Sequence, residues 1–317
     1  MIHPEMLHRD SCVFDNSDLE ALFTFKDVPI FMGCVDSNSS DDIKRDMVWK
    51  ISPITGVIQL TELVPLDILY MNSHTPGTVG SLWNQHHQDF SKFISRFTPG
   101  SVFEIGGSHG ILSKKYKEHY SCIPWTIIEP SPQPQLGVTA KFITGFFNSN
   151  TVIDFHFDTV VHSHVLEHTY YPVEFLRLIH SKLNVNQHMI FSIPNMKSML
   201  EKKYANCLNF EHTFFLDEGI LDHTLHMIGF NILEKNYFKD DHSIFYCCSK
   251  SSRISSDQLR LINNEAYTYN KKLFSDFTDY YTKLVNSINL TGPSSSKIYL
   301  FGAHIFSQVL IQFGLDT

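Results

Sequence analysis

The stretch that decides the fold runs Val102-Phe103-Glu104-Ile105-Gly106-Gly107-Ser108-His109-Gly110. An apolar run leads into a cluster of glycines, and a helical pattern begins directly afterwards at Ile111. A strand, a tight turn and a helix in this order are typical of a nucleotide-binding unit, because the turn lets the backbone approach a ligand. The dinucleotide fingerprint would need glycines at 106, 108 and 111, where this chain has Gly106, Ser108 and Ile111. A pyrophosphate cradle, and with it a nicotinamide-dependent oxidoreductase, is therefore disfavoured.

β-like and helical runs alternate from this stretch to about residue 249. The runs that predict strands are Ser101–Ile105, Trp125–Ile128, Thr159–His162, Met189–Ile193, Asn231–Glu234 and Ile244–Cys248. The runs that predict helices cover 80–97, 111–120, 172–183 and 217–228. Such alternation predicts an α/β fold in which helices cover both faces of a mainly parallel sheet.

The flanking regions have a different texture. Residues 1–75 mix short β-rich runs with turn formers and predict a small β-rich domain, while 76–250 form the α/β domain. Residues 251–317 predict a helical tail: a long amphipathic helix over 259–288, then a strand at Lys297–Phe301 and a helix at Ala303–Phe313. The apolar stripe of the long helix predicts a homodimer.

The composition excludes several classes of protein. The chain has 317 residues, and 25 basic against 33 acidic residues give a net charge of −8, which argues against a partner bound through nucleic-acid phosphates. No stretch approaches the roughly 20 apolar residues of a membrane span, and the polar start is not that of a signal peptide. Six cysteines in such a chain indicate reduced thiols, so we expect a cytoplasmic protein.

The acidic-x-Gly-x-x-x-Gly pattern of Glu104–Gly110 resembles motif I of the class I S-adenosylmethionine (SAM)-dependent methyltransferases. The resemblance implies a Rossmann-like domain with a seven-stranded sheet, with SAM as cofactor and S-adenosylhomocysteine (SAH) as product. It implies that an acid ending the second strand binds the ribose hydroxyls, and Glu129 stands there. The implied cofactor-binding residues in these two segments are Glu104, Gly106, Gly107, Ser108, His109, Gly110 and Glu129.

A second block strengthens this resemblance. Val165-Leu166-Glu167-His168 resembles the run after the fourth strand of the same family, and a Pro-bearing turn, a helix and a strand follow it here as they do there. His168 and His164 are therefore added to the residues expected at the cofactor. The alternation of His162, His164 and His168 around a strand end does not place three imidazoles on one face, so a metal site is not expected.

The segment Asn209–Phe215 resembles the active-site segment of bacterial sugar C-methyltransferases. The match implies His212 as general base and Glu211 as its orienting partner. Residues before motif I, namely Tyr70, His74 and His86, are expected at the substrate or in a lid over the cofactor, although solvated surface histidines are an equal alternative.

Departures from that family change the expected chemistry. Its zinc-binding domain needs four ligands, but Cys12 has Asp15 and Asn16 nearby, and Ser52 and Thr55 replace a cysteine pair, so no structural zinc is expected. Asn209 replaces a tyrosine that would stabilise an enolate, and this makes methylation of a hydroxyl simpler than methylation of carbon.

The sequence therefore predicts a SAM-dependent methyltransferase. Its expected acceptor is a small molecule, namely a nucleotide-linked sugar or another precursor of a surface polysaccharide such as a capsule. Two alternatives stay open at this point. The chain could be a catalytically inactive SAM-binding subunit of an active partner, and Glu211-His212 could simply cap the helix that starts near Asp217.

Overall fold

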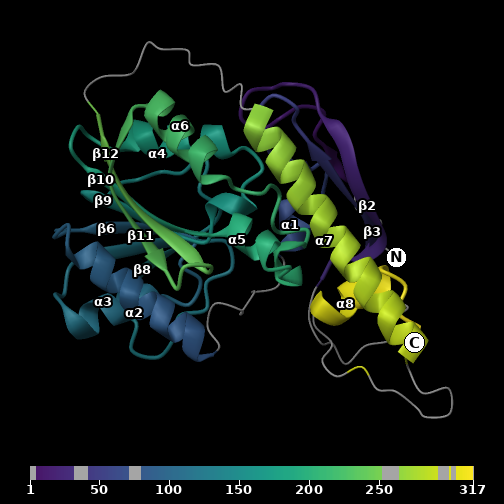
Figure 1. Cartoon of the computed structure of the whole chain (residues 1–317). Helices are drawn as coiled ribbons and strands as arrows, with labels where there is room; N and C mark the ends of the chain where they lie inside the picture. The colour runs from purple at the N-terminus through teal and green to yellow at the C-terminus, as the bar shows by residue number, and fades with distance from the viewer. Residues whose placement is uncertain are drawn as a thin grey trace. The chain divides into compact units, whose positions relative to one another are not determined.

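The computed structural model in Figure 1 describes residues 5–31, 42–70, 80–251, 264–291, 300 and 305–316. The chain divides into two compact units. Unit 1 comprises Met1–Leu69, Met196–Asp217 and Leu261–Thr317, and unit 2 comprises Tyr70–Asn195 and Glu218–Arg260. Residues 196–217, which carry Glu211 and His212, thus belong to the same unit as the two ends of the chain. The division at residues 75 and 250 that the sequence suggests stays a prediction.

Unit 2 is built on a seven-stranded sheet of order β11-β12-β10-β9-β6-β7-β8. Its strands are β6 (Val102–Ile105), β7 (Trp125–Glu129), β8 (Lys141–Thr144), β9 (Thr159–Ser163), β10 (His188–Pro194), β11 (Phe230–Phe238) and β12 (Ser243–Lys250). The five strands from β10 to β8 run parallel, while β12 pairs antiparallel with both β10 and β11. The predicted Rossmann-like class and mainly parallel sheet are confirmed.

Helices cover both faces of this sheet (Figure 1). On one face, α2 (Ser81–Ser95) and α3 (Ile111–His119) bury Phe90, Phe93 and Leu112 against the strands. On the other face lie α4 (Pro172–Lys182) and α6 (Glu218–Ile228), and the ring of Phe175 on α4 meets the ring of His162 on β9. Burial of this apolar surface on both faces explains why the central strands read as nearly continuous apolar runs.

The strand order places a topological switch point between β6 and β9. The chain leaves β6 toward β7 and β8 on one side and returns to β9 and β10 on the other. In open parallel sheets of this kind, ligands bind outside the carboxyl ends of the strands where the order reverses. The glycine turn after β6 and the segment after β9 lie at this point.

Unit 1 contains the β-rich region. A three-stranded sheet joins β2 (Glu20–Pro29), β3 (Lys44–Ile51) and β4 (Ile58–Leu60), and β1 (Leu7–His8) pairs with β5 (Glu62–Leu63). The short helix α1 (Leu66–Leu69) follows. The second segment of unit 1 contributes α5 (Met196–Glu201) and the 3-10 turn η4 (Ala205–Cys207), and a bridge from Gln59 to Phe214 joins it to the first segment.

The long helix α7 (Asn264–Thr291) and the last helix α8 (Ile305–Gln312) complete unit 1. The apolar face of α7 is buried inside this unit, at Leu273, Phe274, Phe277, Tyr281 and Val285. The argument for a homodimer from an exposed stripe on this helix therefore does not hold, although a dimer itself stays a prediction. Of the predicted strand at 297–301 only residue 300 is described, and the first residues of the last predicted helix lie outside the described residues.

Among the described helices, none combines the length and the apolar content that a membrane crossing would need.

Candidate cofactor and proton-transfer site

The turn after β6 has a backbone that requires glycine. Gly106 and Gly110 both have φ of 73°, and a Cβ on Gly106 would lie 2.6 Å from Cγ2 of Val165. A Cβ on Gly107 would lie 2.7 Å from Cγ2 of Ile127, and Ser108 adopts φ of 45° although it is not glycine. Strained positions of this kind persist where the surrounding structure holds them, and they cluster at ligand sites. Glycine therefore lets this turn pack closely against Val165 and Ile127, and cofactor binding by the turn stays a prediction.

Glu129 ends β7 beside this turn and is already fixed by backbone donors. Its Oε2 accepts a hydrogen bond from the N–H of Ser108 at 2.9 Å, and its Oε1 accepts one from Ser131 at 3.2 Å. The carboxylate is half-buried. Each oxygen keeps accepting capacity beyond one donor, and the role of Glu129 at the ribose hydroxyls stays a prediction.

Glu104 lies inside the protein, below the turn. Its side chain is 3% exposed, and its Oε2 accepts a hydrogen bond of 2.7 Å from the indole N–H of Trp125. The pKa of Glu104 is raised to about 7: burial is the largest cause, the bond from Trp125 lowers it, and the neighbouring carboxylate of Glu129 raises it. Sequence reasoning does not place Trp125 at the site, because an aromatic residue at the start of a strand is an ordinary core pattern.

The segment after β9 lies against the glycine turn through Val165. His164, the residue before it, has φ of 53°, and its N–H bonds to the carbonyl of Ser192 at 2.9 Å. The 3-10 turn η3 (Leu166–His168) then buries Glu167 completely. The carboxylate Oε1 of Glu167 lies 3.3 Å from Nδ1 of His164 and 3.7 Å from Nε2 of His168.

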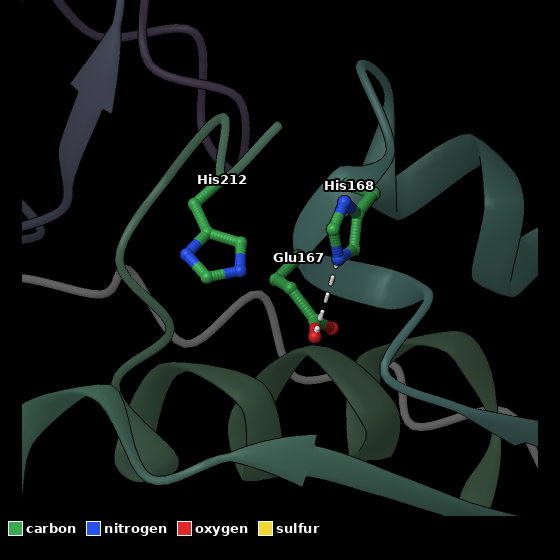
Figure 2. Close-up of side chains that lie close together, drawn as sticks. All are labelled: Glu167, His168 and His212. Atoms are coloured by element: carbon green, nitrogen blue, oxygen red, sulfur yellow. Dashed lines mark ion pairs between the residues drawn. The ribbon is translucent and has the colours of Figure 1, made fainter. Parts of the chain in front are cut away.

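His168 stands between this buried acid and a tyrosine. Figure 2 shows its ring above Glu167, with the ion pair between them dashed. Its other nitrogen, Nδ1, lies 3.0 Å from the hydroxyl of Tyr70. At 3.7 Å the Glu167 contact is longer than a hydrogen bond, so it acts on the imidazole through charge alone. The structure thus brings together Tyr70 and His168, which the sequence assigns to different parts of the site.

His86 is fully buried on α2, so the surface alternative weighed for it is wrong. Its Nε2 lies 2.9 Å from Oγ of Ser192, and its ring centroid is 5.2 Å from that of His164. Ser243 joins His164 at 2.9 Å and His242 at 2.7 Å. Burial lowers the pKa of His164 to about 3 and that of His242 to about 4, so these imidazoles are neutral hydrogen-bonding groups. His74 lies outside the described residues.

His212 and Glu211 lie in unit 1, in a loop that Asn209 holds. The Oδ1 of Asn209 accepts the N–H groups of both Glu211 and His212 at 2.8 Å. The Nδ1 of His212 lies 3.2 Å from the carbonyl of Cys207, so a proton on Nδ1 would leave the basic lone pair on Nε2. Asn209 is therefore a cap for this loop.

The two turns that would carry zinc ligands lie close together, but they contribute one thiol and several hydroxyl groups. Cys12 Sγ lies 3.4 Å from Oγ1 of Thr55, and Oγ of Ser17 lies 2.8 Å from Oγ of Ser52. Ser17 also donates to Asp15 at 2.7 Å. Structural zinc needs four thiolate or imidazole ligands, and burial raises the pKa of the single thiol, so this donor set does not fit the metal.

One family model and several solved structures resemble this chain. Residues 81–235 match the family model of a methyltransferase domain. None of the curated proteins matches the sequence significantly.

Three solved structures illustrate the similarity of fold. The plantazolicin methyltransferase BpumL, in complex with SAH and a monoazolic desmethylPZN analog, has 14% identity and a TM-score of 0.43, over 57% of this chain and 87% of its own. Human N-acetylserotonin methyltransferase in complex with SAM has 14% identity and a TM-score of 0.45, over 54% and 53%. Magnesium protoporphyrin IX methyltransferase from Synechocystis with bound SAH has 16% identity and a TM-score of 0.42, over 56% and 90%.

Proposed function

We propose that this chain, whose residues 81–235 match the model of a methyltransferase domain, uses SAM to methylate a hydroxyl group of a nucleotide-linked sugar or another precursor of a surface polysaccharide. The observation that carries the reaction type is the glycine turn at Gly106–Gly110 next to the pair Glu167–His168, which follows the neighbouring strand and contacts the hydroxyl of Tyr70. The acceptor class rests on the resemblance of Asn209–Phe215 to sugar methyltransferases. We place the reaction in the cytoplasm.

When bound, SAM supplies an electrophilic methyl group on a sulfonium, and the acceptor oxygen must lose its proton as it attacks. The chain's task is to hold the oxygen in line and to accept that proton. His212 is the proposed general base, with Glu211 as its partner, and the Asn209 cap supports this role because it fixes the loop. His168 is the second candidate base, because the buried carboxylate of Glu167 would stabilise its protonated form.

Cofactor binding is tested first, by calorimetric titration of the full chain with SAH. Wild type should bind, and Glu129→Ala should bind at least tenfold more weakly, because losing a hydrogen-bonded charged acceptor costs about 1.5–3 kcal/mol. Asp154→Ala is the matched control, because it also removes a carboxylate but from an exposed residue distant in sequence from Glu129. Its affinity for SAH should be unchanged. Absence of binding in wild type would remove the proposal altogether.

Base assignment is tested by single-turnover rates with a panel of nucleotide-linked sugars. Removing a general base costs roughly 10²–10⁴ in rate. His212→Ala should lose this much while its affinity for SAH stays unchanged. If His168→Asn loses the rate and His212→Ala keeps it, the base is His168. If neither variant changes the rate of an active wild type, both assignments fail.

A catalytically inactive SAM-binding subunit remains the second candidate function, and the replacement of the tyrosine by Asn209 favours it. This candidate predicts SAH binding without turnover on any acceptor in the panel. Methyl transfer by the isolated chain would exclude it.

A further inference from the structure

A buried hydrogen bond connects the second strand of the sheet to the acid below the glycine turn. The indole of Trp125 is 7% exposed and the carboxyl of Glu104 is 3% exposed, and Nε1 donates to Oε2 at 2.7 Å. From above, the backbone of Gly107 closes the space, since a Cβ on it would lie 2.8 Å from Cδ of Glu104. The carboxyl group is therefore held between an indole donor and the turn that forms the proposed cofactor cradle.

We propose that Trp125 is a positioning residue for the cofactor: its indole N–H holds the carboxyl group of Glu104 below the glycine turn and favours the ionised form, and this charge attracts the cationic amino group of SAM or SAH. The inference rests on the proposed cofactor site at Gly106–Gly110. It assigns to Trp125 a function that its place in the core does not require.

The electrostatic surroundings of Glu104 support this role. The groups that act on it are the Trp125 donor and the carboxylate of Glu129, and no ion pair to a lysine, arginine or histidine is present among the described residues. Because burial raises the pKa of Glu104 to about 7, the group is balanced between its two forms near neutral pH. A cationic ligand prefers the ionised form, so ligand affinity should rise as pH rises through this pKa. Trp125 lowers that midpoint, because its hydrogen bond stabilises the charged carboxylate.

A purely structural role makes a different prediction. Trp125 also packs against Tyr116, at 5.4 Å between ring centroids, and Tyr116 is also buried. Loss of that packing would lower the melting temperature and weaken binding equally at every pH. Only loss of the indole N–H would move the pH at which the affinity changes.

The experiment is calorimetric titration of the full chain with SAH at pH values from 5.5 to 8, for wild type, Trp125→Phe, Glu104→Gln and Tyr116→Leu. Wild-type affinity should increase through about pH 7. In Trp125→Phe the midpoint should move upward by about one pH unit. Binding should then be about fivefold weaker than wild type at pH 7, and the two affinities should converge above about pH 8. Glu104→Gln should bind weakly and without pH dependence. Tyr116→Leu should have a lower melting temperature than wild type, but its affinity for SAH should change at the same pH as in wild type.

The outcomes separate this inference from the proposed function. If wild type does not bind SAH, the proposed cofactor site at Gly106–Gly110 is wrong. A wild type that binds, with a Trp125→Phe profile that has the same midpoint, defeats the role of Trp125 alone. If Trp125→Phe does not fold, Glu104→Gln still decides: a pH dependence that survives in this variant shows that Glu104 is not the responsible group and overturns the inference.

Discussion

His162 occupies the middle of β9 with both ring nitrogens buried and without a hydrogen-bond partner among the described residues. Its ring stacks on Phe191 at 4.8 Å between centroids and an interplanar angle of 14°, and Phe175 meets it edge-on at 5.5 Å. Burial lowers its pKa to about 3, so the imidazole is neutral under ordinary conditions. Here the imidazole acts as an aromatic ring whose polar atoms lower the stability of the fold.

The variant His162→Phe should therefore be more stable than wild type. Replacing unpaired buried polar atoms by an apolar ring of similar shape should raise the free energy of unfolding by about 1 kcal/mol, measured by urea denaturation at pH 7. His86→Phe is the matched control on another buried histidine. It breaks the 2.9 Å contact with Ser192, so its free energy of unfolding should be about 1–3 kcal/mol lower than that of wild type. Destabilisation of both variants to the same extent would contradict this account.

At the scale of elements, the strands that carry the site could be predicted because their sequence is decisive. β6, β9 and β10 have nearly every residue buried, and buried parallel strands are continuous apolar runs. β8 could not be predicted, because its four residues are exposed or half-exposed and follow no period. The turn at Gly106–Gly110 could also be predicted, because a backbone with positive φ favours glycine and the glycines can be read in the sequence.

Contacts between distant segments are the part of the site that the sequence could not supply. Tyr70 meets His168 across 98 positions, and His86 meets Ser192 across 106. No local pattern encodes such pairs, because they depend on which strand ends the fold brings together. The Trp125–Glu104 bond had only a weak signal, a strand-initial tryptophan beside an acidic strand.

The end of β9 should also determine how the protein responds to acid. The folded-state pKa values of His162 and His164 are about 3, whereas an unfolded histidine titrates near 6.5. As pH falls, the unfolded state binds these protons at a higher pH than the folded state does. The contribution of the two neutral histidines to the free energy of unfolding should therefore be fully present above about pH 6.5 and decrease as pH falls toward 3.

The measurement is the free energy of unfolding between pH 4 and pH 6. His162→Phe removes one such group, so its slope should be shallower than that of wild type by about 1.4 kcal/mol per pH unit. Phe191→Leu disturbs the same stack without a titrating group, and it should lower stability at every pH with the wild-type slope. Equal slopes in wild type and His162→Phe would show that burial of His162 does not contribute to acid sensitivity.

At the scale of the whole molecule, unit 1 collects three segments that are far apart in the sequence. The bridge from Gln59 to Phe214 and the bond from Asn270 Nδ2 to the carbonyl of Gly56, at 2.9 Å, join one segment to each of the others. Sequence texture alone places residues 196–217 in the α/β domain, because they lie between two of its elements. The structure assigns them to the β-rich unit because their apolar residues, such as Phe214 and Phe215, pack there.

The expectation that unit 1 needs no zinc gives the last prediction. The turns at 12–17 and 52–57 close on themselves through backbone bonds from Asn16 to Cys12 and from Gly56 to Ser52, at 2.9 and 2.8 Å. Hydroxyl contacts then connect the two turns, so we expect the unit to fold without zinc. The wild-type melting temperature should be unchanged by excess EDTA, and purified protein should contain less than stoichiometric zinc.

The geometry of the turns allows the converse experiment. The triple variant Asp15→Cys, Ser52→Cys, Thr55→Cys supplies three thiols around Cys12, and it should take up one zinc ion per chain and melt at a higher temperature with zinc than with EDTA. Adding Cys12→Ser to this variant removes one ligand and should abolish most of the zinc-dependent shift. A wild type that carries one tightly bound zinc ion, or that unfolds on chelation, would contradict a metal-free unit, because one buried thiol among hydroxyl groups cannot account for such affinity.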